Sequence, residues 1–204
     1  MILHELGRVS YSVGLELQKK ARARVLEGGS DELLLLEHDP VVTLGRRGGV
    51  VDSSALRSLQ TPVIETDRGG LATWHGPGQL VGYPIVNLSR AGLKVPRVVE
   101  ILGEILACEA RSHGVEGAAY DCARPGVYVG NRKLAAIGLH LHRGVSSHGF
   151  AFNVNNTLEG FNAIVPCGLN GLGVTTLELE TGRQMDVEVV LRSVRSEIFS
   201  RFSS

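Results

Sequence analysis

Apolar residues recur every three or four positions in three long segments of the chain, which is the spacing of an amphipathic helix. The three segments are Tyr11–Leu26, Pro96–His113 and Asp186–Phe202. The first segment follows Ser10, a favourable N-cap residue, and ends before Gly28 and Gly29, which commonly terminate helices. The pattern therefore predicts three helices, and we expect the first of them to pack on a sheet.

Short runs rich in Val, Ile and Leu, bounded by Gly, Pro or Asp, predict the strands. Before the second helix these runs are Glu32–Leu36, Val41–Leu44, Pro62–Glu65 and Leu80–Val86, which we expect to form the first half of one sheet. After it come Gly126–Val129, Lys133–His142 and His148–Val154, which are separated by turn residues and expected to form a meander. Because hairpin-like connections dominate the second half, we predict an α+β fold with a mixed, largely antiparallel sheet and flanking helices.

The composition favours one domain and argues against several classes of protein. Of the 204 residues, 43% are hydrophobic, and no repeat or linker divides residues 1–204. Twenty-one basic and twenty-one acidic side chains balance each other, so nothing indicates a nucleic acid or membrane partner. The N-terminus lacks the features of a secretion signal, and three cysteines fit neither a disulfide framework nor a zinc site. We therefore expect a cytoplasmic protein.

The segment Asp67–Gln79 is the densest candidate for a built site. Its thirteen residues contain four glycines, a proline, a histidine and the only tryptophan of the chain. Glycines allow backbone N–H groups to approach a ligand closely, so the segment could direct several donors at a carbonyl or carboxylate oxygen. Neither GxGxxG nor GxxxxGK[ST] occurs in it, which argues against a phosphate loop.

Cys167 is the candidate nucleophile. It lies between Pro166 and Gly168, a context that would display its thiol on a turn. A thiol reacts as the thiolate, which a nearby cation or a set of N–H donors favours. The alternative is a small buried residue without chemistry, and this is the interpretation we give to Cys108, near the edge of a helix stripe, and to Cys122, in a short loop.

Lys133 is the candidate cation. It precedes the small apolar run Leu134–Gly138, which is expected to be buried, so its amine could be partly desolvated. Such a lysine could activate a thiol or shuttle the proton of an amine substrate. The alternative is a solvated lysine at the end of a hairpin, and the sequence does not place Lys133 beside Cys167.

Four histidines are further candidates. His75 and His148 each precede a glycine and could donate hydrogen bonds across a pocket. His140 and His142 are two residues apart on a predicted strand and share a face, as metal ligands could, but no third ligand with suitable spacing accompanies them. We therefore expect no metal site.

These motifs together resemble the lipoyl(octanoyl) transferase family, LipB, within the wider group of biotin and lipoate protein ligase catalytic domains. The similarity extends almost end to end, through Leu36–Arg46, Arg68–Pro84, Asn131–Gly138, Phe161–Gly168 and Val174–Leu177. It implies that residues 1–204 form a single domain of this catalytic type. It also implies that Cys167 accepts an octanoyl group as a thioester, while Lys133 lowers the pKa of that thiol and later handles the proton of the acceptor lysine.

The resemblance also implies where the substrate binds. The substrate-binding positions of the family correspond here to Arg68, Gly69, Gly70, Leu71, Ala72, Thr73, Trp74, His75, Ala136, Ile137, Gly138, Gly149, Phe150 and Ala151. These are mostly small or apolar residues beside backbone donors, which suits an eight-carbon acyl chain. Trp74 stands where the family more often has Tyr, and Tyr128 where Trp is common, so pocket shape and chain-length preference are expected to vary.

The partners implied by the resemblance are proteins. The donor would be octanoyl-acyl carrier protein, and the acceptors would be lipoyl domains of 2-oxoacid dehydrogenase E2 subunits and the glycine cleavage H protein. No cofactor or ATP is implied, because amide formation from a thioester is downhill. We also hypothesise that Arg46, Arg47, Arg132 and Arg143 form a basic rim that meets an acidic carrier protein.

Three other functions remain open from the sequence. An ATP-dependent lipoate or biotin protein ligase would use a lysine near position 133 to hold an adenylated acid and would need no thiol. A thiol hydrolase would release the acyl group to water, and an acyl-binding module would form no covalent bond. The presence of Cys167 favours the transferase over the ligase.

Overall fold

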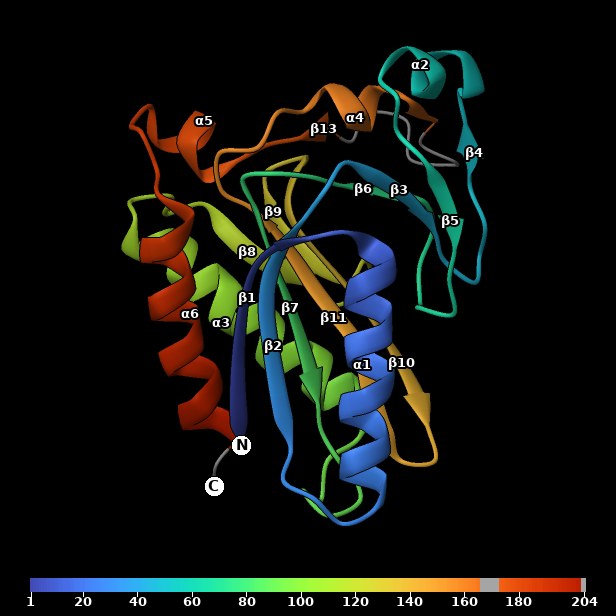
Figure 1. The fold of residues 1–204 in the computed structure, drawn as a ribbon. Coiled ribbons are helices and arrows are strands. Elements are labelled where there is room, and N and C mark those ends of the chain that lie inside the picture. Colours follow the sequence, from blue (N-terminus) through green and yellow to red (C-terminus); the bar gives the residue numbers. More distant parts are fainter. Residues whose placement is uncertain (166–172, 203–204) are drawn as a thin grey trace.

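The computed structural model describes residues 1–165 and 173–202 and is built on one large sheet (Figure 1). The strands of this main sheet are β1 (Ile2–Val9), β2 (Glu32–His38), β7 (Gln79–Ile85), β8 (Ala118–Asp121), β9 (Gly126–Val129), β10 (Arg132–His142), β11 (Val145–Asn153) and β13 (Gly173–Val174). Their order is β1-β2-β7-β11-β10-β9-β8, with β13 beside β10. Only the β1–β2 and β10–β13 pairs of this sheet are parallel among the described residues. The predicted mixed, largely antiparallel sheet is confirmed.

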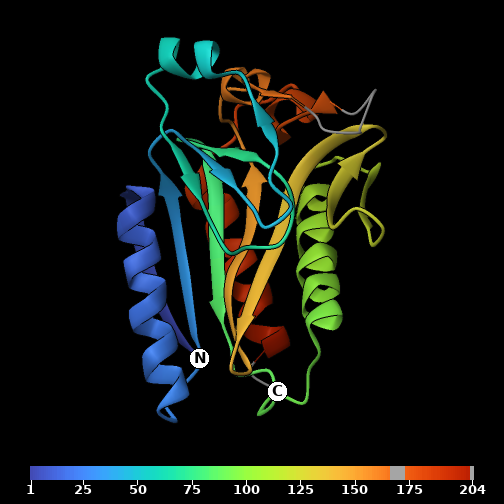
Figure 2. The ribbon, with the colours of Figure 1, turned by 90° about the vertical axis from the view of Figure 1, so that its right-hand side faces the viewer.

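Helices cover both faces of the main sheet (Figure 2). On one face, α1 (Tyr11–Leu26) contacts β2, β7 and β11, and on the other face α3 (Val95–Ser112) and α6 (Val187–Phe202) pack together. All three predicted helices are confirmed, with ends that differ by at most one residue. The side chain of Ser10 accepts a hydrogen bond from Val13 N–H, as expected of an N-cap.

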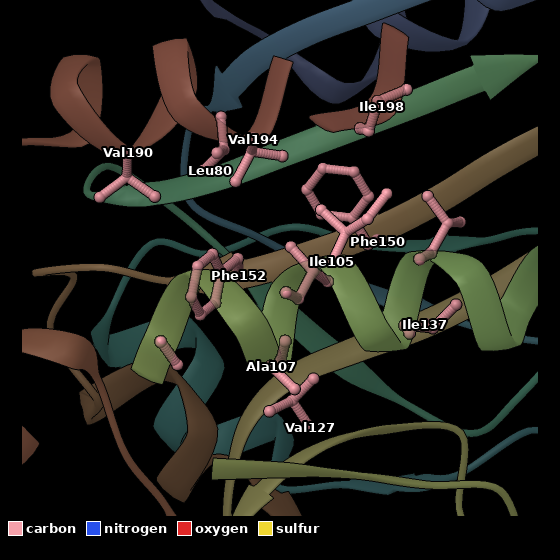
Figure 3. Close-up of a cluster of buried hydrophobic side chains, with 14 of the residues drawn as sticks. Leu80, Ile105, Ala107, Val127, Ile137, Phe150, Phe152, Val190, Val194 and Ile198 are labelled. Carbon is pink, nitrogen blue, oxygen red and sulfur yellow. The ribbon is translucent and has the colours of Figure 1, made fainter. Parts of the chain in front are cut away.

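The continuous apolar run in β2 is explained by burial on both faces of the sheet. Leu33 and Leu35 join the core beneath α3 and α6, whereas Leu34 and Leu36 join the cluster beneath α1. Figure 3 shows the larger core, in which side chains from both helices surround the sheet residues Phe150 and Phe152.

A second, smaller sheet lies over one face of the main sheet, as the two ribbon views show. It contains β3 (Val41–Leu44), β5 (Val63–Glu65) and β6 (Thr73–His75) in the order β5-β3-β6. The prediction that Val41–Leu44 and Pro62–Glu65 belong to the main sheet is therefore wrong. Periodicity identifies a strand but not its partner, and these two strands pair with each other and with β6 instead.

The short helix α5 (Leu177–Thr181) follows β13 at the end of the main sheet, where Glu178 N–H donates to the carbonyl oxygen of Val154. The short elements beside the small sheet are β4 (Val50–Val51), which pairs with β12 (Ile164–Val165), and the helices α2 (Ser53–Ser58) and α4 (Glu159–Asn162). The apolar side chains of Val42, Leu56, Trp74 and Ala163 form a separate small core there. Among the described residues, no helix is both long and apolar enough to cross a bilayer.

Candidate active site

A cavity of about 550 Å³ lies between the main sheet and the small sheet. Its lining comes from the loop before β6, from β9, β10 and β11, and from Ile164 of β12 and both residues of β13, which precede and follow the undescribed segment 166–172. Such a volume is within the range of small-molecule sites in proteins. The cavity therefore brings together residues that are far apart in the sequence.

Small residues form the floor of the cavity on the two long central strands. Ala136 is the direct cross-strand partner of Ala151, and Gly138 is the partner of Gly149. Directly paired residues share a face of the sheet, and all four of these small residues line the cavity. Ile137 and Phe150, two predicted substrate-binding residues, also line the cavity, and both belong to the large core.

The glycine-rich loop, residues 68–72, covers this floor. Gly69 N–H donates a hydrogen bond to the carbonyl oxygen of Leu139 at 3.1 Å, which ties the loop to β10. A Cβ atom at Gly138 would lie 2.7 Å from the carbonyl oxygen of Gly69, so the close contact between loop and strand requires glycine at that position. Gly70 has a φ of 96°, a second position where glycine is favoured. Arg68 to Thr73 all line the cavity, and their role in substrate binding stays a prediction.

Arg68 fixes the loop to the small sheet. Its guanidinium donates hydrogen bonds to the Thr43 carbonyl oxygen at 2.7 Å, to Thr43 Oγ1 at 2.8 and 3.1 Å, and to the Gly69 carbonyl oxygen at 3.1 Å. Burial lowers the pKa of Arg68 from its usual value, although an arginine remains charged under ordinary conditions. The side chain therefore positions the loop and also contributes positive charge to the cavity.

Lys133 lines the end of the cavity near the start of β10. It is the cross-strand partner of Tyr128 on one side and of Val174 on the other, and its carbonyl oxygen accepts a hydrogen bond from Thr175 N–H at 3.0 Å. Burial lowers the pKa of Lys133. The positive charges of Arg124 and then Arg47 lower this pKa further. The desolvation expected for this lysine is therefore present in the structure.

Cys167 lies outside the described residues, so its predicted place beside Lys133 stays a prediction. The described residues on either side of its segment, Ile164 and Gly173, both line the cavity. The other two cysteines can be placed. Cys108 and Cys122 are exposed, so the interpretation of both as small buried residues is wrong. Cys108 lies on the outer side of α3, one position away from the stripe that packs on the sheet.

The indole of Trp74 does not line the cavity. Thr73 and His75 line it, and because side chains alternate along a strand, Trp74 of β6 points the other way into the small core with Val42 and Leu56. It is 4% exposed and stacks edge-on against Phe161. The substitution of Trp for Tyr at this position therefore affects the packing of the small sheet rather than the wall of the cavity.

His75 belongs to a buried chain of hydrogen bonds that crosses the molecule. Its Nδ1–H donates to Gln79 Oε1 at 2.7 Å, Gln79 Nε2–H donates to Asn153 Oδ1 at 2.9 Å, and Asn153 Nδ2–H donates to the Thr175 carbonyl oxygen at 2.9 Å. Burial holds the pKa of His75 well below its usual value, so the ring is neutral. This series of hydrogen bonds connects His75 of the small sheet to Thr175, the residue that directly follows β13.

His148 lies at another edge of the cavity, with its Nε2–H donating to Asp67 Oδ1 at 2.7 Å. His140 Nε2 is 3.4 Å from the other oxygen of the same carboxylate. The two histidines thus hold the start of the glycine-rich loop rather than facing the centre of the cavity. No group of three or more histidine, cysteine, aspartate or glutamate side chains suitable for a metal occurs in the described part of the chain.

Several cavity residues have no counterpart in the sequence analysis. These are Tyr11 at the start of α1, Tyr83 on β7, Arg124 in the β8–β9 turn and Phe161 on α4. Each is an isolated aromatic or basic residue in its own segment, so only the packing of distant elements reveals that they line one cavity.

The four arginines of the hypothesised basic rim do not form one surface. Arg132 and Arg143 lie at opposite ends of the eleven-residue strand β10 and its hairpin, a separation of roughly 35 Å for an extended strand. Arg132 is also paired with Glu180, with donor–acceptor distances of 2.8 Å. Of the four, only Arg47 lines the cavity. The structure therefore does not support a rim made of all four arginines.

Comparison with known proteins identifies relatives over nearly the whole chain. A family model described as "Lipoyl protein ligase A/B catalytic domain" matches residues 10–199. A protein of Nocardia farcinica named octanoyltransferase is 43% identical over 205 residues, which cover 97% of this chain and 80% of the relative. An octanoyltransferase of Caldicellulosiruptor bescii is also 43% identical, over 94% of this chain and 86% of the relative.

Solved structures share the fold at low sequence identity. The bipartite lipoate protein ligase of Thermoplasma acidophilum, described together with its E2 lipoyl domain, superimposes with a TM-score of 0.74. The identity is 17%, and the match covers 99% of this chain and 83% of that chain. At this identity the similarity shows a common architecture only.

Proposed function

Because the chain belongs to the family of lipoyl protein ligase A/B catalytic domains, we propose that it is an octanoyltransferase of lipoate biosynthesis. It transfers an octanoyl group from octanoyl-acyl carrier protein to the ε-amine of a lysine on a lipoyl domain. Acceptors of this kind are the E2 subunits of 2-oxoacid dehydrogenases and the glycine cleavage H protein, and the reaction takes place in the cytoplasm.

The observation that carries this proposal is that Lys133 lines the same cavity as described residues that precede and follow the segment 166–172, which contains Cys167. Ile164 and Gly173 flank that segment and line the same cavity as Lys133. β13 begins six residues after Cys167 and pairs with β10 at Lys133. The small residues of β10 and β11 on one side of the cavity and the glycine-rich loop on the other suit an unbranched acyl chain. Burial of such a chain contributes about 0.8 kcal/mol per CH₂ to binding.

In the first step, the thiolate of Cys167 attacks the carbonyl carbon of the carrier thioester. The bond to the carrier thiol breaks, and that thiol leaves with the proton that Cys167 gave up. A cation next to the thiol favours its ionised form, and Lys133 supplies this charge when it is protonated. Backbone N–H groups of the glycine-rich loop are suited to polarise the carbonyl oxygen.

In the second step, the acceptor lysine attacks the acyl-enzyme as a neutral amine. The new C–N bond forms, the bond to Cys167 breaks, and the proton of the attacking amine passes to neutral Lys133. The lowered pKa of Lys133 increases its neutral fraction near physiological pH, which favours this role. Since a thioester is exchanged for an amide, the reaction needs no ATP.

The proposal is tested by mixing the protein with octanoyl-acyl carrier protein and measuring its intact mass, with and without a lipoyl domain. We expect the protein to gain the mass of one octanoyl group. When the lipoyl domain is added, the protein should lose this mass and the lipoyl domain should gain it. Cys167→Ala should abolish the adduct, whereas Cys108→Ala and Cys122→Ala should not, because both of those thiols are exposed and neither lines the cavity.

The same experiment separates the alternatives. Turnover of the adduct without a lipoyl domain would indicate a hydrolase, and the absence of any adduct would indicate a binding module. Transfer by Cys167→Ala that depends on ATP and free octanoic acid would indicate a ligase. Any of these three results would reject the transferase.

A further inference from the structure

His148 combines a buried position with a backbone conformation that is uncommon for a residue with a side chain. It lies within β11 and is 3% exposed, yet its φ is 56°, in the left-handed region. The other two non-glycine residues with a positive φ in the described chain, Gln60 and Arg143, are exposed and lie in turns. A left-handed conformation costs free energy for most residues other than glycine, and strained residues of this kind cluster at functional sites.

The left-handed conformation changes the face of the sheet on which the His148 side chain lies. Side chains alternate along a strand, so His148 should share the face of Phe150, which belongs to the large core beneath α3 and α6. Instead its ring stands edge-on to the ring of Tyr83, with the ring centres 6.3 Å apart, and Tyr83 belongs to the cluster beneath α1. Ala151 of the cavity floor belongs to the same cluster. The backbone therefore turns the imidazole out of the large core and toward the cavity.

On this face, the imidazole reaches the residue that precedes the glycine-rich loop. Nε2–H of His148 donates to Asp67 Oδ1 at 2.7 Å. The Asp67 side chain is 55% exposed, and contacts of exposed charged groups contribute little to the stability of a fold. Stability alone therefore does not account for the strained histidine, whereas the position of the loop does.

Few contacts attach the glycine-rich loop to the main sheet. The guanidinium of Arg68 attaches the loop to the small sheet. Toward the main sheet, Asp67 and Gly69 make the hydrogen bonds and ion pairs of this segment among the described residues. Gly69 N–H donates to the carbonyl oxygen of Leu139, and Leu139 is the direct cross-strand partner of His148. The two attachments thus lie side by side and together fix the distance between the loop and the cavity floor.

We propose that His148 is a positioning residue, which holds the glycine-rich loop over the cavity through its hydrogen bond to Asp67. The distance between the loop and β10 determines the space that is left for the acyl chain. This role rests on the proposed octanoyl transfer and adds His148 and Asp67 to it, with no contact between either residue and the substrate.

Two substitutions of Asp67 test this contact. Asp67→Ala removes the acceptor, whereas the matched control Asp67→Asn keeps one oxygen that can accept a hydrogen bond from His148. Because the Asp67 side chain is half exposed, neither change should lower the midpoint of urea unfolding appreciably. For Asp67→Ala we expect the KM for octanoyl-acyl carrier protein, followed by intact mass, to rise about tenfold with little change in kcat. For Asp67→Asn we expect a KM close to that of the unmodified protein.

His148→Asn tests the same contact from the other side. Asparagine adopts the left-handed conformation readily, but its side chain is shorter than that of histidine and has no donor at the position of Nε2. It should raise the KM as much as Asp67→Ala does, and the double variant should raise it no further, because both changes remove one contact. His140→Asn, which removes the longer contact of 3.4 Å to Asp67, should raise the KM less.

Hydrogen exchange of the Gly69 amide measures the position of the loop without any substrate. We expect this exchange to be about tenfold faster in Asp67→Ala and His148→Asn than in the unmodified protein. Equal exchange rates, additive effects on KM in the double variant, or a loss of stability that matches the rise in KM would overturn the proposal. If the unmodified protein is not acylated, the transferase proposal fails, whereas faster exchange would still show that His148 positions the loop.

Discussion

Two glycines of the cavity should respond very differently to the addition of one methyl group. In Gly149→Ala, the new Cβ atom would lie 2.7 Å from Cδ of Pro84 and closer still to the carbonyl oxygen of Gly82, on the neighbouring strand β7. In Gly69→Ala, the nearest atom would be the carbonyl oxygen of Leu139 at 3.3 Å. Real Cβ atoms essentially never approach other atoms within 3.0 Å, so only the first change requires a strand to move.

The expected magnitudes follow from these contacts. Forcing extra volume into a packed region costs about 1–3 kcal/mol, and Gly149→Ala should lie near the upper value because the obstacle is backbone. For Gly69→Ala, the small adjustment at Leu139 is offset by about 0.4–1 kcal/mol from the reduced freedom of the unfolded chain. We expect its net change to be below about 1 kcal/mol.

Urea unfolding followed by circular dichroism measures both changes. With a slope of about 2–3 kcal/mol per M, Gly149→Ala should lower the unfolding midpoint by roughly 1 M, and Gly69→Ala should shift it by much less. Equal midpoints for the two variants, or a Gly149→Ala protein as stable as the unmodified chain, would refute the argument that the floor of the cavity needs glycine to let β7 and β11 pair.

Three other predictions concern titratable groups. Lys133→Met should slow transfer from the acyl-enzyme to a lipoyl domain by about 100-fold or more, with little change in the midpoint of urea unfolding. Transfer at the normal rate in a single-turnover assay would exclude Lys133 as the base. Arg47→Gln removes a positive charge that lowers the pKa of Lys133, so this pKa should rise in the variant. The pH at which the transfer rate begins to increase should then be higher than in the unmodified protein. A shift of this pH to a lower value would contradict the electrostatic effect. Burial lowers the pKa of His38 from 6.5 to about 4, so below pH 6.5 the unfolded chain takes up a proton that the folded chain does not. The free energy of unfolding should therefore decrease by roughly 3 kcal/mol as the pH falls from 6.5 to about 4, and urea titrations showing constant stability over this interval would disprove it.

Elements with strong local signals can be predicted from the sequence alone. The helix Tyr11–Leu26 carries its own periodicity, cap and terminator, and the run of four leucines from Leu33 predicts a strand. The residues of Lys133, Cys167 and the glycine-rich loop could also be selected from the sequence, because a reactive group needs a particular residue type in a particular local context. Local signals were too weak for six strands of the described residues, β1, β4, β6, β8, β12 and β13. For example, β1 is a half-exposed edge strand with a register shift, and β6 has only three residues within a glycine-rich segment.

Which of these elements contact each other depends on the tertiary structure. The same periodicity describes β2 and β3, yet β2 joins the main sheet while β3 pairs in the small sheet with β5 and β6. The desolvation of Lys133 and the turn of Trp74 away from the cavity both depend on these pairings. Burial, charge and hydrogen bonding are properties of a residue's neighbours in space. Most of those neighbours come from distant parts of the chain, and no local pattern of residues specifies them.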